Sequence, residues 1–277
     1  MKSMIVSRYC RKMGMRKFSF ALVELMLTAA VLAIIAVLVI PFFSRANQKG
    51  RYTTWVNQKN RILSDGDLRV YYDFADGEGS IVRNSARGFH QQDYDPIVND
   101  ARIVKGATWS NGRWQMKPSL EFDGSSGYMS ANADITNKSA TYILWVKLQE
   151  ASGGLMMTAK TRKKDSPSML KINIQKGFVR AAIKRKAVIS KEACKLSQWH
   201  MVAVTVGEKN NSLKLFLDGK SQGEVNNVPL KGLEQNSFLL AYCSGSGYFK
   251  GRIGEFMAFS RELSAEEVQK IYQETHP

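Results

Sequence analysis

The sequence predicts a mainly β protein, a two-sheet antiparallel sandwich that follows a long N-terminal helix and precedes a short C-terminal helix. Two observations carry this prediction. An apolar run extends from Phe18 to Phe43 with a single charged residue inside it. From Leu68 onward, short alternating or aromatic segments are separated by turn residues, as in β-sandwiches. The 277 residues leave room for a membrane helix and one domain of about 200 residues.

The apolar run is long enough to cross a bilayer as a helix. The first 19 residues carry six basic residues and no acidic one, which favours a cytoplasmic N-terminus. We therefore expect a single-pass inner-membrane protein whose C-terminal domain faces the periplasm or the cell surface. Glu24 is the charged residue inside the run, and a carboxylate in such a place is costly enough to indicate a functional site.

The segment from Ser19 to Leu25 reads SFALVEL and resembles the N-terminal processing site of type IV pilins and pseudopilins. The resemblance implies that a prepilin peptidase cuts between Ser19 and Phe20 and that Phe20 is then methylated. Glu24 would be fifth from the cut and would serve assembly with other pilin-like subunits. Pro41 would be twenty-second, where the family often has a helix-kinking proline. Ser19 stands where the family usually has glycine.

The physical role of Glu24 follows from its surroundings. A carboxylate among packed helices can pair with the N-terminal ammonium of a neighbouring subunit, which neutralises both charges where the dielectric is low. The alternative is an uncleaved signal anchor with one tolerated acidic residue. That alternative makes the protein a tethered glycan- or protein-binding protein of the cell surface.

The strand pattern follows a linker at residues 64–67. Lys176-Gly177 and Asp218-Gly219 read as hairpin turns, and Ser264 to Glu267 reads as a capping box that opens a helix from Ala265. The expected strands are Leu68–Phe74, Thr141–Lys147, Leu170–Gln175, Phe178–Ile183, Trp199–Val206, Leu213–Leu217, Phe238–Tyr242 and Ile253–Phe259.

Several of these segments resemble, in order, the laminin-G-like, concanavalin-A-like jelly roll. They include YYDF at 71–74, LEFDGS at 120–125, YILWV at 142–146, QWHMVAVT at 198–205, LFLDGK at 215–220 and FKGRIGEF at 249–256. The resemblance implies a two-sheet sandwich that mostly binds glycans or proteins. The predicted organisation is a leader at 1–19, a pilin-like helix at 20–63 with its membrane part at 20–43, a linker at 64–67 and a jelly-roll domain at 68–277.

The candidates for chemistry are few. Glu121 and Asp123 lie on one side of a strand, as in the Glu-x-Asp-x-x-Glu pattern of glucanases on this fold, but Ser126 occupies the third carboxylate position. We therefore expect a structural or adhesive protein of a filament or secretion system, with no enzymatic activity and no cofactor for chemistry. A secreted glycoside hydrolase is the remaining alternative.

The metal ion that the sequence leaves as a candidate is Ca²⁺. Some domains of this fold bind Ca²⁺ through loop oxygens. The carboxylates near the early loops form no dedicated spacing, which favours ordinary turn residues over calcium ligands; they are Asp73, Asp76, Glu78, Asp93, Asp95 and Asp123. Three histidines without a Cys/His cluster argue against zinc.

The net charge of +16 suits anionic partners. A basic loop and hairpin predict a polyanion-binding face, without specific nucleic-acid recognition; its residues are Lys163, Lys164, Arg180, Lys184, Arg185 and Lys186. A solvated sheet face is the alternative.

Two pairs of residues complete the candidates. Trp109 and Trp114 lie in a stretch with Gly and Asn and are candidates for stacking against sugars. Cys194 and Cys243 would face an oxidising compartment, where they either form a disulfide or remain as two buried thiols.

Overall fold

The structure of the protein is a computed structural model that describes residues 3–88, 99–114, 116–132, 139–159, 170–230 and 237–276. Residues 3–21, 44, 87 and 88 are described by their backbone alone. The chain divides into two compact units, Met1–Gly50 and Arg51–Pro277. We call the second unit the head, and each unit is described by itself.

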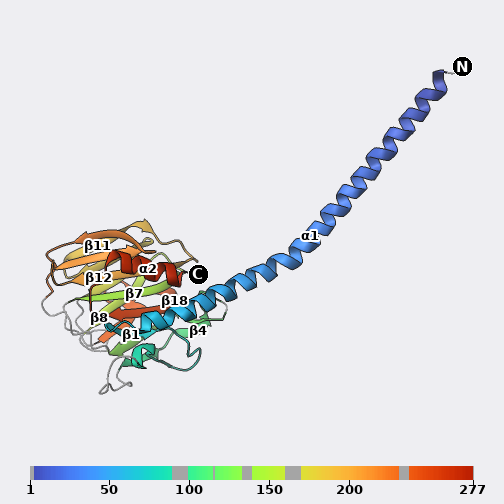
Figure 1. The fold of residues 1–277 in the computed structure, drawn as a ribbon. Helices are drawn as coiled ribbons and strands as arrows, with labels where there is room; N and C mark the ends of the chain where they lie inside the picture. The colour runs from blue at the N-terminus through green and yellow to red at the C-terminus, as the bar shows by residue number, and fades with distance from the viewer. Residues whose placement is uncertain are drawn as a thin grey trace. The chain divides into compact units, whose positions relative to one another are not determined.

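The long helix α1, Ser3–Leu63, contributes to both units (Figure 1). We call its residues 22–50 the stem and its residues 51–63 the neck. Pro41 lies within α1, and the helical backbone continues on both sides of it. Proline lacks an amide hydrogen, so one helical hydrogen bond is missing there.

The head is a sandwich of two antiparallel sheets, as the sequence predicts, and its core lies between them. We call the two sheets A and B. Sheet A has the order β14-β13-β12-β7-β18-β5-β4, and β1 pairs with β18 at one side. Its strands are β1 Leu68–Tyr72, β4 Ala107–Asn111, β5 Pro118–Asp123, β7 Ala140–Leu148, β12 Trp199–Gly207, β13 Ser212–Leu217, β14 Lys220–Val225 and β18 Lys250–Phe259.

Sheet B has the order β11-β10-β9-β8-β15-β6-β3-β2. A small hairpin of β16 Tyr242–Cys243 and β17 Gly247–Tyr248 is separate from both sheets, and a short 3-10 helix spans Ser85–Gly88. The strands of sheet B are β2 Ile81–Val82, β3 Ala101–Val104, β6 Tyr128–Asn132, β8 Gly153–Ala159, β9 Leu170–Gln175, β10 Phe178–Ile183, β11 Lys186–Ala193 and β15 Ser237–Leu240.

The two predicted hairpin turns are present. Lys176 and Gly177 join β9 to β10, and both have positive φ angles of 53° and 86°. Asp218 and Gly219 join β13 to β14 with φ angles of 51° and 75°. Two consecutive positive φ values match the twist of a two-residue hairpin, which explains why glycine holds the second position in each.

Sheet A buries both of its faces. Leu144 and Val146 of β7 point into the core between the sheets, whereas Ile143 and Trp145 point outward into a second apolar cluster. That cluster also contains Ile62 and Leu63 of the neck, together with Leu263, Val268 and Ile271 at the C-terminal end of the chain. Because the neck and helix α2, Ala265–Thr275, cover this face, β7 is buried along nearly its whole length.

Helix α2 begins where the sequence predicts. The Ser264 hydroxyl accepts a hydrogen bond from the Glu267 amide at 3.2 Å, and the Glu267 carboxylate accepts one from the Ser264 amide at 2.8 Å. This reciprocal cap satisfies two amides that the first turn leaves unpaired. Val268 and Ile271 then face sheet A, so the cap fixes the register at which α2 packs.

Candidate functional site

The stem exposes apolar side chains on every side. Its large apolar residues between Leu22 and Phe43 are 38–72% exposed. Of the helices that the structure describes, one is long and apolar enough to cross a membrane; it is α1 from Leu22 to Leu63, whose most apolar window has a mean hydropathy of 2.8 and no buried residue. A helix that is apolar all round needs an apolar environment. The stretch 22–43 measures about 33 Å at 1.5 Å per residue, close to a bilayer core of about 30 Å.

Glu24 is exposed within this apolar stretch. The other polar side chain nearby, Thr28, donates a hydrogen bond to the Leu25 carbonyl at 2.9 Å and so satisfies itself within the helix. Glu24 has no such local arrangement available, since a carboxylate accepts hydrogen bonds and the helix has already used its amides. Ser19 and Phe20 lie in helical backbone, and their side chains are outside the described residues.

A buried ionic cluster joins the neck to sheet A. Lys59 of the neck forms an ion pair with Asp73, which follows β1. Glu255 of β18 forms ion pairs with two cations from the loop between β4 and β5: Arg113 Nη2 lies 2.6 Å and Lys117 Nζ 3.1 Å from its carboxylate oxygens. Both cations and Glu255 are buried, so the attraction within the cluster is weakly screened.

Arg113 connects the greatest number of elements in this cluster. Its Nη1 donates to the Thr275 carbonyl at 2.7 Å, which ties the end of α2 to the same place. Its guanidinium lies 4.2 Å from the ring centre of Trp145 and 4.7 Å from that of Trp114. A planar guanidinium suits this position because it stacks on aromatic rings while its edges donate hydrogen bonds.

The aromatic cover of the cluster includes Trp114, which the sequence suggested as a platform for sugars. Trp114 is only 2% exposed and lies 5.7 Å, centre to centre, from the neck residue Trp55. Trp55 in turn stacks on Tyr52 and covers the ammonium of Lys117 at 4.9 Å. The prediction for Trp114 is therefore wrong, because the neck buries the ring that the local Gly and Asn composition suggested would be exposed.

Burial and charge act in opposite directions on these groups. Burial lowers the pKa of Lys117 to about 8, although Glu255 acts to raise it. Burial also lowers the pKa of Arg113 and raises that of Tyr71, whose hydroxyl lies 3.3 Å from Glu255. For Asp73, burial raises the pKa but the Lys59 ammonium outweighs it, and the net shift is downward.

Trp109 belongs to strand β4 rather than to a loop. Its indole N–H donates to the Gly79 carbonyl at 2.9 Å, and its ring meets Phe74 edge-to-face at 6.3 Å. It also packs against the core between the sheets. The ring is half-buried, and its polar edge is already used.

The two carboxylates of β5 have structural partners. Glu121 pairs with Arg252 at 2.8 Å and accepts from Gln149 at 2.6 Å. Asp123 accepts from the amides of Ser125 and Ser126 and from both hydroxyls, and these hydrogen bonds hold the pKa of Asp123 well below its usual range. An acid/base catalyst needs a pKa near the working pH, so Asp123 is unsuited to that role.

The two cysteines of the head are separate free thiols, so the structure contradicts a disulfide between them. Cys194 follows β11 and Cys243 lies in β16, and both are buried. Burial raises the pKa of Cys194 to about 12 and that of Cys243 to about 11. Thiols of this kind react slowly because the thiolate is the reactive form.

The predicted polyanion face is described in part. Lys184 and Arg185 form the turn between β10 and β11, Lys186 is the first residue of β11, and all three are exposed; Arg180 is half-buried on β10. In the described part of the chain, none of these four has an ion-pair partner. Lys163 and Lys164 lie outside the described residues. Leu170, the first residue of β9, pairs with Ile183 next to this turn.

The candidate calcium ligands within the described residues do not converge. Asp73 pairs with Lys59, Asp76 lies 3.7 Å from Arg83, and Asp123 caps its own turn. Among the described residues, no group of three or more His, Cys, Asp or Glu side chains is placed to hold a metal ion. Asp93 and Asp95 lie outside the described residues.

The family model of the concanavalin A-like lectin/glucanases superfamily, of laminin-G type, matches residues 122–269. The chain belongs to this superfamily. The match covers most of the sandwich and both hairpins at positive φ, which confirms the jelly-roll prediction. No curated protein sequence matches the chain.

Solved structures show the same fold at low sequence identity. The chain is similar to domain 4 of AbnA, an extracellular arabinanase from Geobacillus stearothermophilus solved with arabinotriose, at 16% identity and a TM-score of 0.56 over 75% of this chain and 98% of that one. It is similar to Trypanosoma rangeli sialidase with the inhibitor DANA at 14% identity, TM-score 0.58, over 81% of this chain and 38% of that one.

A third similar structure is the receptor binding domain of botulinum neurotoxin C/D mosaic serotype, at 12% identity and TM-score 0.55 over 75% of this chain and 51% of that one. Identities this low establish the fold alone. The neighbours include carbohydrate-binding and glycoside hydrolase proteins, so the choice between these activities rests on this chain's own residues.

The sequence reasoning missed the ionic cluster. One signal was available, because Glu255 lies in the otherwise apolar stretch from Ile253 to Phe259 and such a carboxylate needs a partner. Its partners Arg113 and Lys117 lie in a loop about 140 residues earlier, and nothing in that loop indicates that its cations point inward.

Proposed function

We propose that this protein is a pilin-like, membrane-anchored subunit that displays a jelly-roll binding head outside the cytoplasm, with a structural or adhesive role. The stem carries the proposal. Between residues 22 and 43 it exposes apolar side chains in every direction, and its one carboxylate is Glu24. Lipid and the stems of neighbouring subunits are environments that satisfy such a surface.

The position of Glu24 in the apolar part of the stem supports a role in assembly with other subunits. A lone tethered head gains nothing from a carboxylate in its anchor, whereas a subunit processed at Phe20 carries an ammonium four residues before it. The ammonium of one subunit and the Glu24 of the next would neutralise each other in the membrane. The partners in this account are a prepilin peptidase and other pilin-like subunits.

The head supports a binding role over catalysis. Arg252, Gln149 and the Asp123 turn already engage the two carboxylates of β5 that could imitate a glucanase site. The fold is one that solved neighbours use for contact with carbohydrate. A head that recognises a surface ligand, on a subunit held by its stem, is consistent with an adhesive protein.

The mature N-terminus tests the proposal most simply. Mass spectrometry of the chain from cells that have a prepilin peptidase should find methylated Phe20 as the first residue. A chain that keeps residues 1–19 would contradict processing and would favour the tethered cell-surface binder.

A second test separates assembly from anchoring. Leu32→Cys allows disulfide cross-linking between the stems of neighbouring subunits. In that background, Glu24→Ala should leave the chain in the membrane but abolish the cross-link. Thr28→Ala, four residues away on the same helix, is the matched control and should retain cross-linking. Equal cross-linking in both variants would contradict an assembly role for Glu24.

The turn between β10 and β11 favours an anionic ligand for the head. Lys184, Arg185 and Lys186 are adjacent and exposed. Changing all three to Glu should abolish salt-dependent retention on heparin. The control triple Lys176→Glu, Lys195→Glu and Lys209→Glu makes the same change of charge at exposed sites elsewhere, and Lys176 shares the positive φ of Lys184. Equal retention of both triples would contradict a ligand face at this turn.

A further inference from the structure

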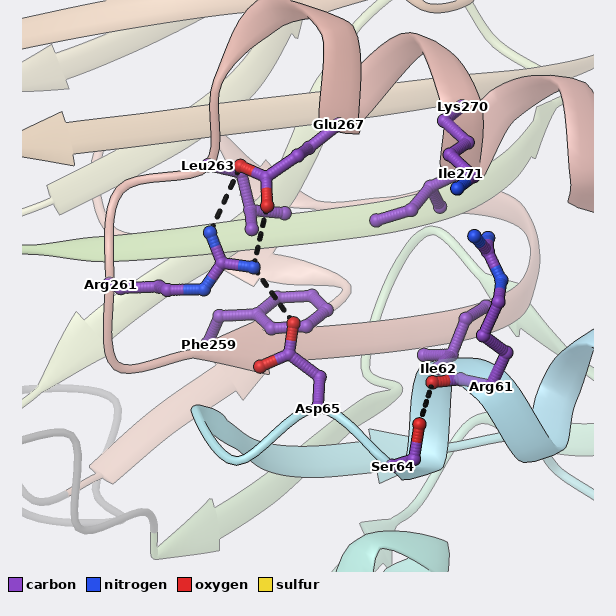
Figure 2. Close-up of a pocket in the computed structure, with 10 residues that line it drawn as sticks. All are labelled: Arg61, Ile62, Ser64, Asp65, Phe259, Arg261, Leu263, Glu267, Lys270 and Ile271. Atoms are coloured by element: carbon purple, nitrogen blue, oxygen red, sulfur yellow. Dashed lines mark hydrogen bonds and ion pairs between the residues drawn. The ribbon is translucent and has the colours of Figure 1, made fainter.

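A pocket of about 270 Å³ lies in the head between the end of the neck, the end of β18 and helix α2 (Figure 2). We call it the neck pocket. Buried apolar side chains from three elements line it: Ile62 of the neck, Phe259 of β18, and Leu263 and Ile271 beside and within α2. Water molecules next to these apolar side chains have few hydrogen-bond partners, so their replacement by an apolar part of a ligand is favourable in free energy.

Two acidic groups at the rim of the neck pocket share one cation. Arg261 pairs with Asp65 at 2.8 Å and with Glu267 at 2.7 Å, and Figure 2 shows its guanidinium between the two carboxylates. These contacts raise the pKa of Arg261, with Glu267 as the largest cause. The three side chains carry a net charge of −1, and Arg261 is already engaged by both carboxylates, so it is not available to a ligand in the pocket.

Two further cations remain at the rim. Figure 2 shows the charged ends of Arg61 and Lys270 directed toward each other on one side of the pocket. Arg61 also pairs with Glu274, whereas the exposed Lys270 has no ion-pair partner in the described part of the chain. Because Glu274 already compensates Arg61, Lys270 is the one of these two cations that an anion in the pocket would newly compensate.

We infer that the neck pocket binds a small organic anion, with its carboxylate between Lys270 and Arg61 and its apolar body on Ile62, Leu263 and Ile271. The volume equals that of about nine water molecules at about 30 Å³ each. A ligand with a similar number of non-hydrogen atoms, such as an aromatic or short aliphatic carboxylate, matches this size. The inference does not depend on how the N-terminus is processed.

Such a ligand would contact the neck and α2 at once. Arg61 and Ile62 belong to the neck, whereas Lys270 and Ile271 belong to α2. The site is complete only when the neck is packed on the head, so the ligand binds that state and stabilises it by mass action. A small metabolite bound in the neck pocket would therefore stabilise the packing of the neck on the head.

Benzoate and benzamide are suitable probes, since they have the same shape and differ in charge. The full chain in lipid nanodiscs, with labelled isoleucine methyl groups, reports binding at Ile62 and Ile271, and Ile253 in the core between the sheets serves as the internal reference. Benzoate should shift the first two signals saturably with a Kd of about 1 mM or tighter, as expected for a ligand of this size. Benzamide should bind at least about fivefold more weakly, because it lacks the charge that the two cations attract.

Two variants and a control locate the site. Lys270→Glu should weaken benzoate by about tenfold or more, since it reverses a contacting charge. Lys209→Glu makes the same change at an exposed position in another turn and should leave the affinity unchanged. Ser64→Trp, at the exposed rim, should block both probes.

Three results would overturn the inference. The first is equal affinity for benzoate and benzamide, which would show that the two cations do not select an anion. The second is unchanged benzoate affinity in Lys270→Glu or Ser64→Trp. The third is the absence of any saturable shift at Ile62 and Ile271.

Discussion

The stem and the neck are parts of one helix, yet their side chains have opposite environments. In the stem, Leu25 and Leu32 are 70% and 65% exposed, and no residue of the most apolar window is buried. In the neck, Trp55, Ile62 and Leu63 are 4–6% exposed and pack against the head. The neck is amphipathic, whereas residues 22–43 of the stem are apolar on all sides.

This difference separates two ways of using a helix. The neck finds its partner within the same chain, through a buried stripe and an ion pair between Lys59 and Asp73. The stem has no such stripe, so its partner must surround it. One continuous helix therefore has one part whose partner lies outside the chain and another part that packs within the head.

The largest effect on the packing of the neck is expected from Glu255→Ala. It leaves Arg113 and Lys117 buried without their carboxylate, and removal of one member of a buried charge set costs about 3–5 kcal/mol. Denaturant unfolding of the head should show that loss. Glu262→Ala removes the partner of Lys214 at a site where both side chains are more than a quarter exposed, and should cost at most about 1 kcal/mol.

An equally small loss in the free energy of unfolding for Glu255→Ala and Glu262→Ala would contradict the role of the cluster in holding the neck against the head. Glu24→Ala provides the comparison from the stem. It should leave the unfolding of the head unchanged, since no described contact connects Glu24 to the head.

The next largest effect should come from Trp55→Ala. Removal of a buried tryptophan costs about 3 kcal/mol or more, because it opens a cavity over Trp114 and Lys117. Hydrogen exchange should speed up in the neck and in the loop at 112–117 more than in β7. Val56→Ala changes the adjacent, 38% exposed side chain and should leave the exchange rates nearly unchanged. Uniform acceleration throughout the head would contradict a local role for Trp55.

A smaller effect should appear as pH dependence. Lys117 has a pKa of about 8 in the folded head against 10.5 when unfolded, so between these values the unfolded chain binds more protons. Folding stability from this group therefore rises with pH in that window, by at most about 1.4 kcal/mol per pH unit. Because the buried thiols act in the opposite direction above their usual pKa near 9, the comparison belongs between about pH 7.5 and 9.

Lys117→Met isolates this contribution, because it keeps the volume and removes the titrating group. The stability of the natural chain minus that of the variant should rise with pH. A difference that stays flat or falls would show that Lys117 is not held in a desolvated site.

The smallest effect is an expected absence of change. Because Cys194 and Cys243 are separate buried thiols, a reducing agent should leave the melting temperature of the head unchanged. A thiol reagent should label neither residue until the head unfolds. A fall in melting temperature on reduction would mean that the two cysteines pair.

The sequence was sufficient where the determinants are local. The hairpin turns at Lys176-Gly177 and Asp218-Gly219, the cap at Ser264 and the strand alternation on either side of them all depend on a few neighbouring residues. Strands β9 and β10 have the bounds predicted for them. The jelly-roll topology was implied by the resemblance to the laminin-G-like family, which the ordered segments carry.

The sequence was insufficient where partners come from distant elements. Trp114 resembles a surface residue until Trp55, which belongs to a helix that precedes the sandwich, covers it. The sequence predicts the neck only as the end of the pilin-like helix at 20–63, and its packing against sheet A depends on which face of the sheet remains uncovered. Cys194 and Cys243 illustrate the same limit, since compartment suggests a disulfide but only geometry decides it.

Spin labels along α1 in vesicles test the central claim most directly. Leu32→Cys and Ile34→Cys place labels on nearly opposite faces of the stem, and Val56→Cys places one on the exposed side of the neck. The account predicts that both stem labels relax strongly with oxygen and weakly with a water-soluble nickel chelate, and that the neck label does the reverse. Chelate access to either stem label, equal to that at Val56, would contradict a stem surrounded by lipid.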